Sequence, residues 1–444
     1  MTSSLRMPLA SLALELTEGR VSARSLVEES LAAIAEDPRA FVSVAADRAR
    51  QEAEEIDLAR RKGRSLSPWA GIPISVKDLF DVAGEVTRAG AKALAERAPA
   101  EHDAAVVARL RAAGFIIMGR TQMSEYAFTG IGLNPHVPQP VNPLDPERAP
   151  GGSSGGAGVS VALAQVQCAI GTDTGGSVRI PAAWCGVVGF KPTQSRISRA
   201  GAYPLSQNLD SIGPLCRTVD DCRILDRIMA DDPTPDDAPG PMTDIVLAIP
   251  DRVVLDDVAP EVAVAWERAL DKIASAGMIL AALPFPELDA MIEANARGTL
   301  SNAEAYAAHR RARLLDRREA YDPNVLARVE IGSGMSAADY LDLLARRESL
   351  IADAEARTAP FHAVIAPTTP NLAPRFTEIS DPAAFARENA LALRNTSVAN
   401  FLDRCAISLP MASDRAPAGF MMIGARMADA QLLRIAERIA PLIA

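Results

Sequence analysis

The chain has 444 residues, of which 48% are hydrophobic and 23% charged, and its formal net charge is −10 at pH 7. No uninterrupted apolar run approaches the ~18 residues that a membrane-spanning helix needs, and the first 20 residues lack the long apolar core of a secretory signal. Acidic and basic residues are interspersed, which argues against nucleic-acid binding by charge alone. These features predict a cytoplasmic globular protein without a membrane or nucleic-acid partner.

The N-terminal third predicts helices followed by alternating strands and helices. Residues 1–70 are expected to be mostly helical, with a helix from about 23 to 35 capped by Ser22 and a charged helix from about 44 to 62. A strand at 72–77, a helix near 103–113 and a strand at 115–118 follow. This alternation is typical of a largely parallel sheet that is covered by helices on both faces.

Lys77 is one of only five lysines, whereas arginine is abundant. It lies in the apolar, strand-like run Gly-Ile-Pro-Ile-Ser-Val-Lys-Asp, where a solvated charge is not expected. A lysine at such a position is most often a strand end whose ammonium reaches solvent. A desolvated lysine can instead lose its proton, which arginine cannot, so Lys77 is a candidate general base.

Two glycine-rich loops present serines, at Gly-Gly-Ser-Ser-Gly-Gly (151–156) and Gly-Thr-Asp-Thr-Gly-Gly-Ser (171–177). Glycine allows tight turns and close backbone approach, so Ser153 and Ser177 are expected on open loops. A flexible linker is the common interpretation of such runs, but apolar segments flank both. No Gly-Lys-Ser/Thr follows either loop, which excludes a Walker phosphate loop.

The residues between and after the loops predict how the two serines meet. The small apolar stretch 157–168 suits a buried helix, and 168–172 suits a short buried strand. Pro181 fits only an early helical position, so Thr174 to Ser177 should immediately precede a helix, where backbone N–H groups are free. Free N–H groups beside a serine are what an oxyanion hole requires.

Histidine and cysteine patterns favour neither metal nor disulfide chemistry. The four histidines form no His-x-x-x-His or His-Glu-x-x-His pair, which disfavours a zinc hydrolase and a Ser-His-Asp triad. The five cysteines stand in mostly apolar settings without a Cys-x-x-Cys and are expected to be reduced core residues. We expect no metal and no cofactor.

Beyond Pro192 the chain is expected to be irregular before regular elements resume, and no polar linker divides it. We therefore predict a single domain over 1–444, with 1–65 as an N-terminal helical layer and 285–360 as a helical insertion or cover. The remaining predicted elements are helices at 219–230, about 259–275 and 428–442, and strands at 245–249, 277–281, 363–366, 406–409 and 418–423.

The sequence resembles the amidase signature family over most of its length. The strongest similarity lies in GGSSGG (151–156) and GTDTGGSVRIPAAWCGVVGFKPT (171–193). It extends to GIPISVKDLF (71–80) and 119–143, and more weakly to APTTPNLAP (366–374) and NFLDRCAISLP (400–410). The resemblance implies an α/β fold with a large mixed, mainly parallel twisted sheet covered by helices on both faces.

The resemblance also implies a Ser–Ser–Lys triad, with Ser177 as nucleophile, Ser153 as bridging serine and Lys77 as base. Ser154 is the residue most easily confused with Ser153, but the 24-residue separation between Ser153 and Ser177 matches the family. The family has a cis peptide bond before the bridging serine, which corresponds to the 152–153 bond.

Several residues around the triad are assigned supporting roles. Asp173 and Arg179 flank the nucleophile and are expected to form an ion pair that holds its loop. Thr129 matches a segment that lines the pocket in the family, so its hydroxyl, or the backbone of Gly130, is expected to meet the substrate amide. The oxyanion hole is expected to consist of the backbone N–H groups of Thr174, Gly175, Gly176 and Ser177.

These assignments predict an amidase that cleaves a C–N bond of a small amide to a carboxylate and ammonia or an amine, through a seryl acyl-enzyme. The expected partner is the small-molecule amide, with a homodimer as the candidate assembly. Two alternatives stay open. One is the glutaminase subunit of a tRNA-dependent amidotransferase, which shares the motifs, and the other is a catalytically silent amide-binding relative.

Overall fold

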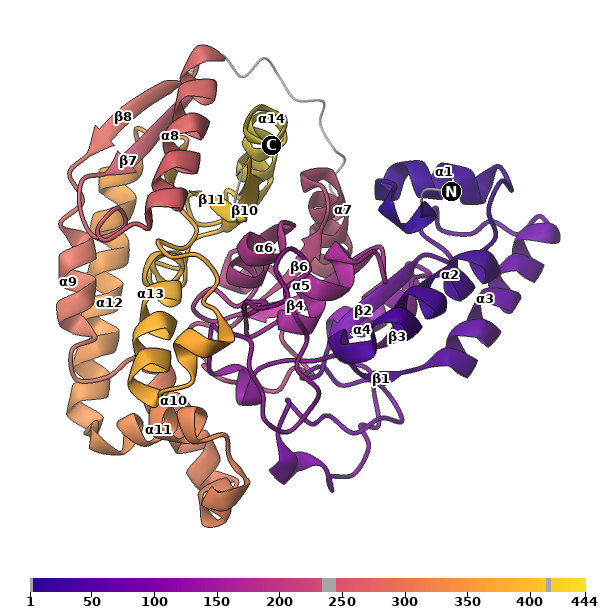
Figure 1. The fold of residues 1–444 in the computed structure, drawn as a ribbon, viewed down its shortest axis with the longest axis horizontal. Helices are drawn as coiled ribbons and strands as arrows, with labels where there is room; N and C mark the ends of the chain where they lie inside the picture. The colour runs from indigo at the N-terminus through magenta and orange to yellow at the C-terminus, as the bar shows by residue number, and fades with distance from the viewer. Residues whose placement is uncertain (1–2, 234–244, 413–416) are drawn as a thin grey trace.

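The protein is built on one 11-stranded sheet that crosses the whole molecule (Figure 1). The computed structural model describes residues 3–233, 245–412 and 417–444. The strand order is β1-β3-β2-β4-β6-β5-β10-β11-β9-β7-β8. The N-terminal helices lie at one end of the molecule, and β7 and β8 lie with α8, α9 and α12 at the other. The strands are β1 (Phe41–Val44), β2 (Pro73–Lys77), β3 (Ile116–Thr121), β4 (Cys168–Asp173), β5 (Val188–Lys191), β6 (Ser211–Cys216), β7 (Val246–Pro250), β8 (Ile279–Leu283), β9 (Ala363–Pro367), β10 (Ala406–Met411) and β11 (Ala418–Ile423).

Several helices, among them α2, α3, α7, α8 and α14, begin and end near the residues that the sequence indicates, whereas α13 was not predicted. Ser22 caps α2 through a hydrogen bond from the Ser25 N–H, as predicted, and α6 begins two residues after Ser177. The α-helices are α1 (Leu9–Thr17), α2 (Ala23–Glu36), α3 (Ala46–Arg61), α4 (Ala105–Ala112), α5 (Gly155–Ala162), α6 (Arg179–Cys185), α7 (Val219–Ala230), α8 (Pro260–Ser275), α9 (Glu287–Ala294), α10 (Leu300–Arg311), α11 (Pro323–Ile331), α12 (Ala337–Thr358), α13 (Pro382–Phe401) and α14 (Asp429–Ile443).

The sheet is mixed, but the expectation that it is mainly parallel is wrong. Six of its ten described strand pairings are antiparallel and four are parallel. The parallel pairs lie toward the two ends, where β2 joins β3 and β4, and β7 joins β8 and β9. The centre is antiparallel because β5 and β6 return beside β4 and because β10 and β11 are consecutive neighbours. Neither β5 nor β6 was predicted from the sequence.

Helices cover both faces of the sheet, as predicted, and alternate residues of a strand enter different cores. In β4, Cys168 and Ile170 pack into the core that α4, α7, α8 and α14 complete, whereas Ala169 faces α2, α3, α5 and α6. In β10, Ile407 belongs to the first core, and Ala406 contacts a core that α9, α12 and α13 complete. This period-2 alternation follows from strand geometry.

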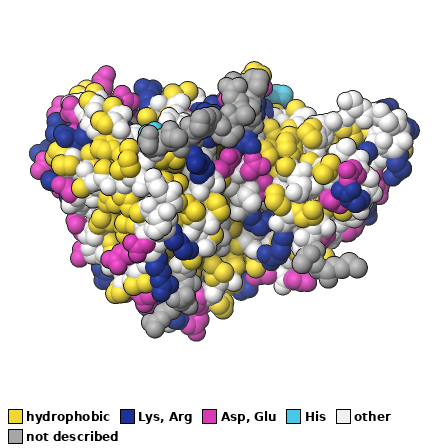
Figure 2. All heavy atoms as spheres, turned by 90° about the horizontal axis from the view of Figure 1, so that it is seen from above, with side chains coloured by type: hydrophobic (Ala, Val, Ile, Leu, Met, Phe, Trp, Pro, Cys, Tyr) yellow, Lys and Arg dark blue, Asp and Glu magenta, His cyan; other side chains and the backbone are white. Residues whose placement is uncertain are grey.

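The distribution of surface charge and the burial of the cysteines are as the sequence predicted. Acidic and basic side chains are interspersed over the face drawn in Figure 2. All five cysteines are buried and none forms a disulfide. Within the residues that the structure describes, no helix is long and apolar enough to cross a membrane.

Candidate active site

Lys77 is the last residue of β2 and lies inside the sheet, between β3 and β4. Its side chain is fully buried. The Nζ atom donates hydrogen bonds to Ser153 Oγ at 2.7 Å and to Thr172 Oγ1 at 2.9 Å. Lys77 is therefore not a strand end that extends into solvent, and it directly contacts the serine predicted to be its partner.

The environment of Lys77 favours the neutral amine. Burial lowers the pKa of Lys77 from 10.5 to about 7, although the negative charges of Asp173 and Asp210 act in the opposite direction. Desolvation penalises the ammonium form because water no longer solvates its charge. An amine with this pKa can accept a proton near neutral pH.

The two glycine-rich loops lie against each other. The Gly152–Ser153 peptide bond is cis, as the resemblance implied. The N–H of Ser154 donates to the carbonyl oxygen of Ser177 at 3.2 Å, and its hydroxyl donates to the Thr172 carbonyl at 3.3 Å. Ser153 and Ser177 are 0% and 4% exposed, so both side chains are largely shielded from solvent.

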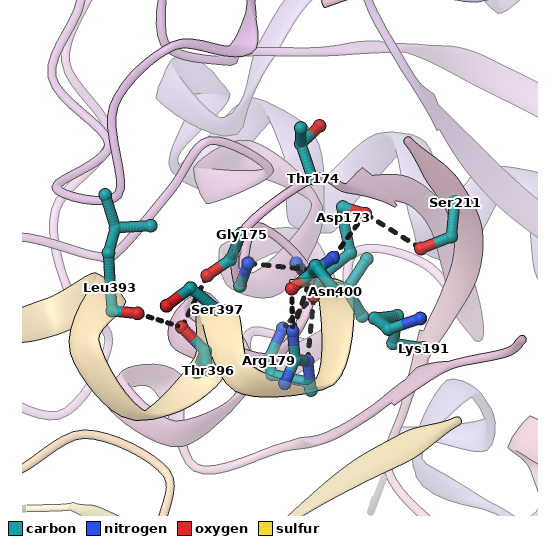
Figure 3. Close-up of polar contacts among 12 residues, drawn as sticks. Asp173, Thr174, Gly175, Arg179, Lys191, Ser211, Leu393, Thr396, Ser397 and Asn400 are labelled. Carbon is teal, nitrogen blue, oxygen red and sulfur yellow. Dashed lines mark hydrogen bonds and ion pairs between the residues drawn. The ribbon is translucent and has the colours of Figure 1, made fainter. Parts of the chain in front are cut away.

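Asp173 and Arg179 form the ion pair expected beside Ser177 (Figure 3). The guanidinium donates through Nη2 to Asp173 Oδ1 at 2.9 Å and through Nε to Oδ2 at 3.0 Å, and both side chains are fully buried. Burial is the largest single effect and would raise the pKa of Asp173, but the charge and hydrogen bonds of Arg179, with Lys191 and Asn400, together outweigh it and the pKa falls to about 2. Asn400 completes the cluster by donating to Asp173 Oδ1 at 2.9 Å and accepting from Arg179 at 2.7 Å.

The carboxylate of Asp173 also shapes the loop of the nucleophile, and this changes the expected oxyanion hole. The Gly176 N–H donates to Asp173 Oδ1 at 2.8 Å, so it is engaged within the protein. The N–H groups of Gly175 and Ser177 donate no hydrogen bond to any residue in the described part of the chain. Gly176 has φ of +139°, and a Cβ there would collide with Thr396, which explains the need for glycine.

Thr129 and Gly130 differ in their access to a ligand. Thr129 lines the cavity beside Ser177, and its buried hydroxyl has no hydrogen-bond partner in the described protein. The Gly130 N–H donates to Asn389 Oδ1 at 2.7 Å, and its carbonyl accepts from Gly152 N at 2.8 Å. Gly130 therefore supports the loop through both backbone groups, and its N–H is already engaged within the protein.

A cavity of about 430 Å³ opens beside Ser177. Its lining includes residues 127–129, the Ser177 loop (Thr174, Gly175 and Ser177), and side chains from α9, α11 and α13. Most of the wall is apolar, and its charged members are two arginines. The lining includes Ser177, Thr129, Met291, Arg328, Leu393 and Arg394.

Sequence reasoning missed several residues that hold this site. Thr172 accepts from Lys77, and Asp210 accepts from the Thr174 hydroxyl at 2.6 Å. Asn400 and Thr396 come from α13, and the Thr396 hydroxyl donates to the Gly175 carbonyl at 2.6 Å (Figure 3). Asn400 stands at the start of the weakly similar stretch 400–410, which was the one available indication of its importance.

The described part of the site offers no metal-binding arrangement. Among the residues that the structure describes, no group of three or more His, Cys, Asp or Glu side chains is placed to hold a metal ion. The chemistry that the side chains offer is a buried amine beside two hydroxyl groups and free backbone N–H donors.

Comparison with known proteins places the chain in a family. The Amidase family model matches residues 25–433. The chain is 36% identical over 406 residues to a 2-amino-5-chloromuconic acid deaminase of Comamonas testosteroni, covering 89% of this chain and 87% of the relative. It is 34% identical over 433 residues to one subunit of the glutamyl-tRNA(Gln) amidotransferase of Moorella thermoacetica, covering 90% and 88%. A crystal structure of an amidase superposes with a TM-score of 0.90 at 33% identity, covering 99% of this chain and 100% of the other. Because the family model spans most of the chain and the 11-stranded fold agrees with it, the chain belongs to the amidase family, whose members hydrolyse carbon–nitrogen bonds.

Proposed function

We propose that this amidase hydrolyses the C–N bond of a small linear amide through a Ser–Ser–Lys triad. The observation that carries the proposal is the 2.7 Å hydrogen bond between Lys77 Nζ and Ser153 Oγ, made by a lysine whose pKa lies near 7. A general base works best when its pKa is close to the working pH. Retention of this buried pair beside Ser177 also argues against a silent amide-binding relative.

In the proposed reaction, Ser177 Oγ attacks the amide carbonyl carbon while its proton passes through Ser153 Oγ to neutral Lys77. The same relay then returns a proton to the amide nitrogen, the C–N bond breaks, and ammonia or an amine departs. Ser177 is left as an acyl ester. Water attacks this ester by the same proton path, which releases the carboxylate and regenerates Ser177.

The N–H groups of Gly175 and Ser177 are the proposed oxyanion donors, with the N–H of Thr174 as the third candidate. Donors fixed in advance stabilise the charge that develops on the carbonyl oxygen. The bonds from Asp173 to Gly176 and from Thr396 to Gly175 hold this loop in place. Gly176 acts through the conformation of the loop, because its own N–H is already occupied.

Ammonia release by the purified protein alone, measured on a panel of small amides, tests the proposal. Wild-type protein should release ammonia, and Ser153→Ala should not. Ser154→Ala is the matched control, since its backbone N–H still donates to Ser177 and only a 3.3 Å hydroxyl contact is lost. If Ser154→Ala loses as much activity as Ser153→Ala, the relay is assigned to the wrong residue.

The glutaminase subunit of an amidotransferase is the second candidate, favoured by the 34% identity to one subunit of such an enzyme. A glutaminase of this kind depends on its complex, whereas a stand-alone amidase turns over substrate by itself. Robust turnover of non-glutamine amides by the isolated chain would exclude this candidate. Activity on glutamine that appears only with added partner proteins would favour it.

A further inference from the structure

The cavity beside Ser177 is cationic in a protein that is acidic overall. The formal net charge of the chain is −10, yet the residues lining this cavity include Arg328 and Arg394 and no aspartate or glutamate from the described part of the chain. A low-dielectric cavity lined by one sign of charge concentrates ligands of the opposite sign. The cavity is therefore suited to an anionic group.

The side chain of Arg328 has fewer hydrogen-bond partners within the described protein than that of Arg394. It lies on α11, partly buried, with its Cζ 4.9 Å from the centroid of the Phe128 ring. Its Nε is buried and has no hydrogen-bond partner, and no ion pair joins it to a carboxylate in the described part of the chain. Burial lowers the pKa of Arg328 to about 10, so the side chain stays charged at neutral pH.

Arg394 is anchored within the protein. Its Nη2 donates to the Asp256 carbonyl oxygen, and its Nε donates to Asn395 Oδ1 at 3.2 Å. A buried donor without a partner is unfavourable, so a ligand that accepts a hydrogen bond from Arg328 Nε would be stabilised there. Stacking on Phe128 stabilises the cation and holds its plane, but it satisfies no N–H donor.

We propose that Arg328 binds a carboxylate on the substrate, at the end away from the amide that Ser177 attacks. This inference rests on the proposed function and narrows its substrate class to small amides that also carry a carboxylate. The guanidinium presents two parallel N–H donors that match the two oxygens of a carboxylate. Met291 and Leu393 line the wall of the same cavity, which suits a short hydrocarbon spacer between the two ends.

The same lining predicts which carboxylates are rejected. No acidic side chain of the described residues lines the cavity, so the ammonium of an α-amino acid would be desolvated without a counter-ion, which is costly. The site should therefore prefer glutaramate, which has a carboxylate and a terminal amide, over L-glutamine, which adds an ammonium.

The first test compares kcat/KM for glutaramate, neutral valeramide and L-glutamine. Arg328→Gln should lower the value for glutaramate about 10- to 100-fold, mainly through KM, and change valeramide less than about threefold. Arg328→Lys keeps the charge but loses the two parallel N–H donors. Its kcat/KM for glutaramate should therefore lie between those of the wild type and Arg328→Gln. Arg311→Gln, at an exposed position on α10 outside the cavity, is the matched control for net charge and should behave as wild type. Equal losses on glutaramate and valeramide in Arg328→Gln would overturn the inference.

The second test measures binding without turnover. Calorimetry with Ser177→Ala protein should detect glutaramate binding that weakens at least about tenfold in the Ser177→Ala/Arg328→Gln double variant. If the wild-type protein releases no ammonia from any amide, the proposed function fails, but this binding difference still decides the role of Arg328. Absence of binding, or equal binding in both proteins, would overturn the carboxylate site even if neutral amides are hydrolysed.

Discussion

The protonation of Lys77 should control the rate on the acid side. With the ordinary pKa of 10.5, about one Lys77 in 1,000 would be neutral at pH 7.5, whereas with a pKa of about 7 about three in four are neutral. The base acts only in its neutral form, so activity should fall as the pH drops through 7. At pH 6, kcat/KM should be about one tenth of its plateau above pH 8.

Lys77→Arg separates a base from a fixed cation. Arginine keeps a positive charge beside Ser153 but does not release its proton at these pH values. The variant should therefore be as inactive as Lys77→Met at every pH between 6 and 9, in an ammonia-release assay on protein whose thermal unfolding shows that it is folded. Lys62→Arg, at an exposed lysine, serves as the control for the substitution itself. Near wild-type rates for Lys77→Arg, or an acid limb that persists in its profile, would refute the base assignment.

Three further outcomes are expected. Ser177→Ala should lose at least about three orders of magnitude of rate, and a fluorophosphonate should label Ser177 in wild-type protein as mapped by peptide mass; labelling elsewhere would remove its assignment. Asp173→Asn should lower the free energy of unfolding by about 3–5 kcal/mol in denaturant titrations, because it leaves the buried Arg179 charge uncompensated; a loss below about 1 kcal/mol would contradict that account. Chelators and brief thiol alkylation should leave activity unchanged, because no described cluster could hold a metal and all five cysteines are buried, so activity restored by added zinc would contradict the metal-free mechanism.

Local chemistry explains what could be predicted well from the sequence. Some residue patterns constrain the local structure around them. They are the Gly-Gly-Ser loops, a proline that fits only an early helical position, and a lysine in an apolar strand. Those constraints made Lys77 a candidate base and placed α6 just after Ser177, whereas the pairing of Lys77 with Ser153, which the structure shows, was implied by the resemblance. The Asp173–Arg179 pair was also accessible, because its members are six residues apart.

Non-local pairing explains most of what was missed. β1 has four residues with two exposed side chains, and its pairing with β3 cannot be inferred from its own composition. β5 (VGFK) is short and contains glycine, and β6 (SIGPLC) contains both glycine and proline, residues that weaken a strand pattern. With these strands unplaced, the antiparallel centre of the sheet was not predicted.

The omission of α13 had a different cause. The helix buries asparagine and threonine side chains along with apolar ones, so it lacks a clear apolar stripe. Its start was nevertheless marked, since Asp381 caps the helix by accepting from Ala384 N at 2.9 Å and Pro382 occupies the first turn. Two of the polar residues that obscured the pattern, Thr396 and Asn400, bind the loop of Ser177.

α13 contacts both the loop of Ser177 and the cavity beside it. Asn400 and Thr396 bind Asp173 and the Gly175 carbonyl, while Leu393, one turn earlier, lines the cavity (Figure 3). Because a helix is stiff over these two turns, a change of side-chain volume at Leu393 that shifts the helix would also move the donors that hold the oxyanion loop. Substitutions in α13 should thus alter kcat as well as KM. Arg328 lines the cavity from α11, so its substitution should change substrate preference with little effect on the chemical step.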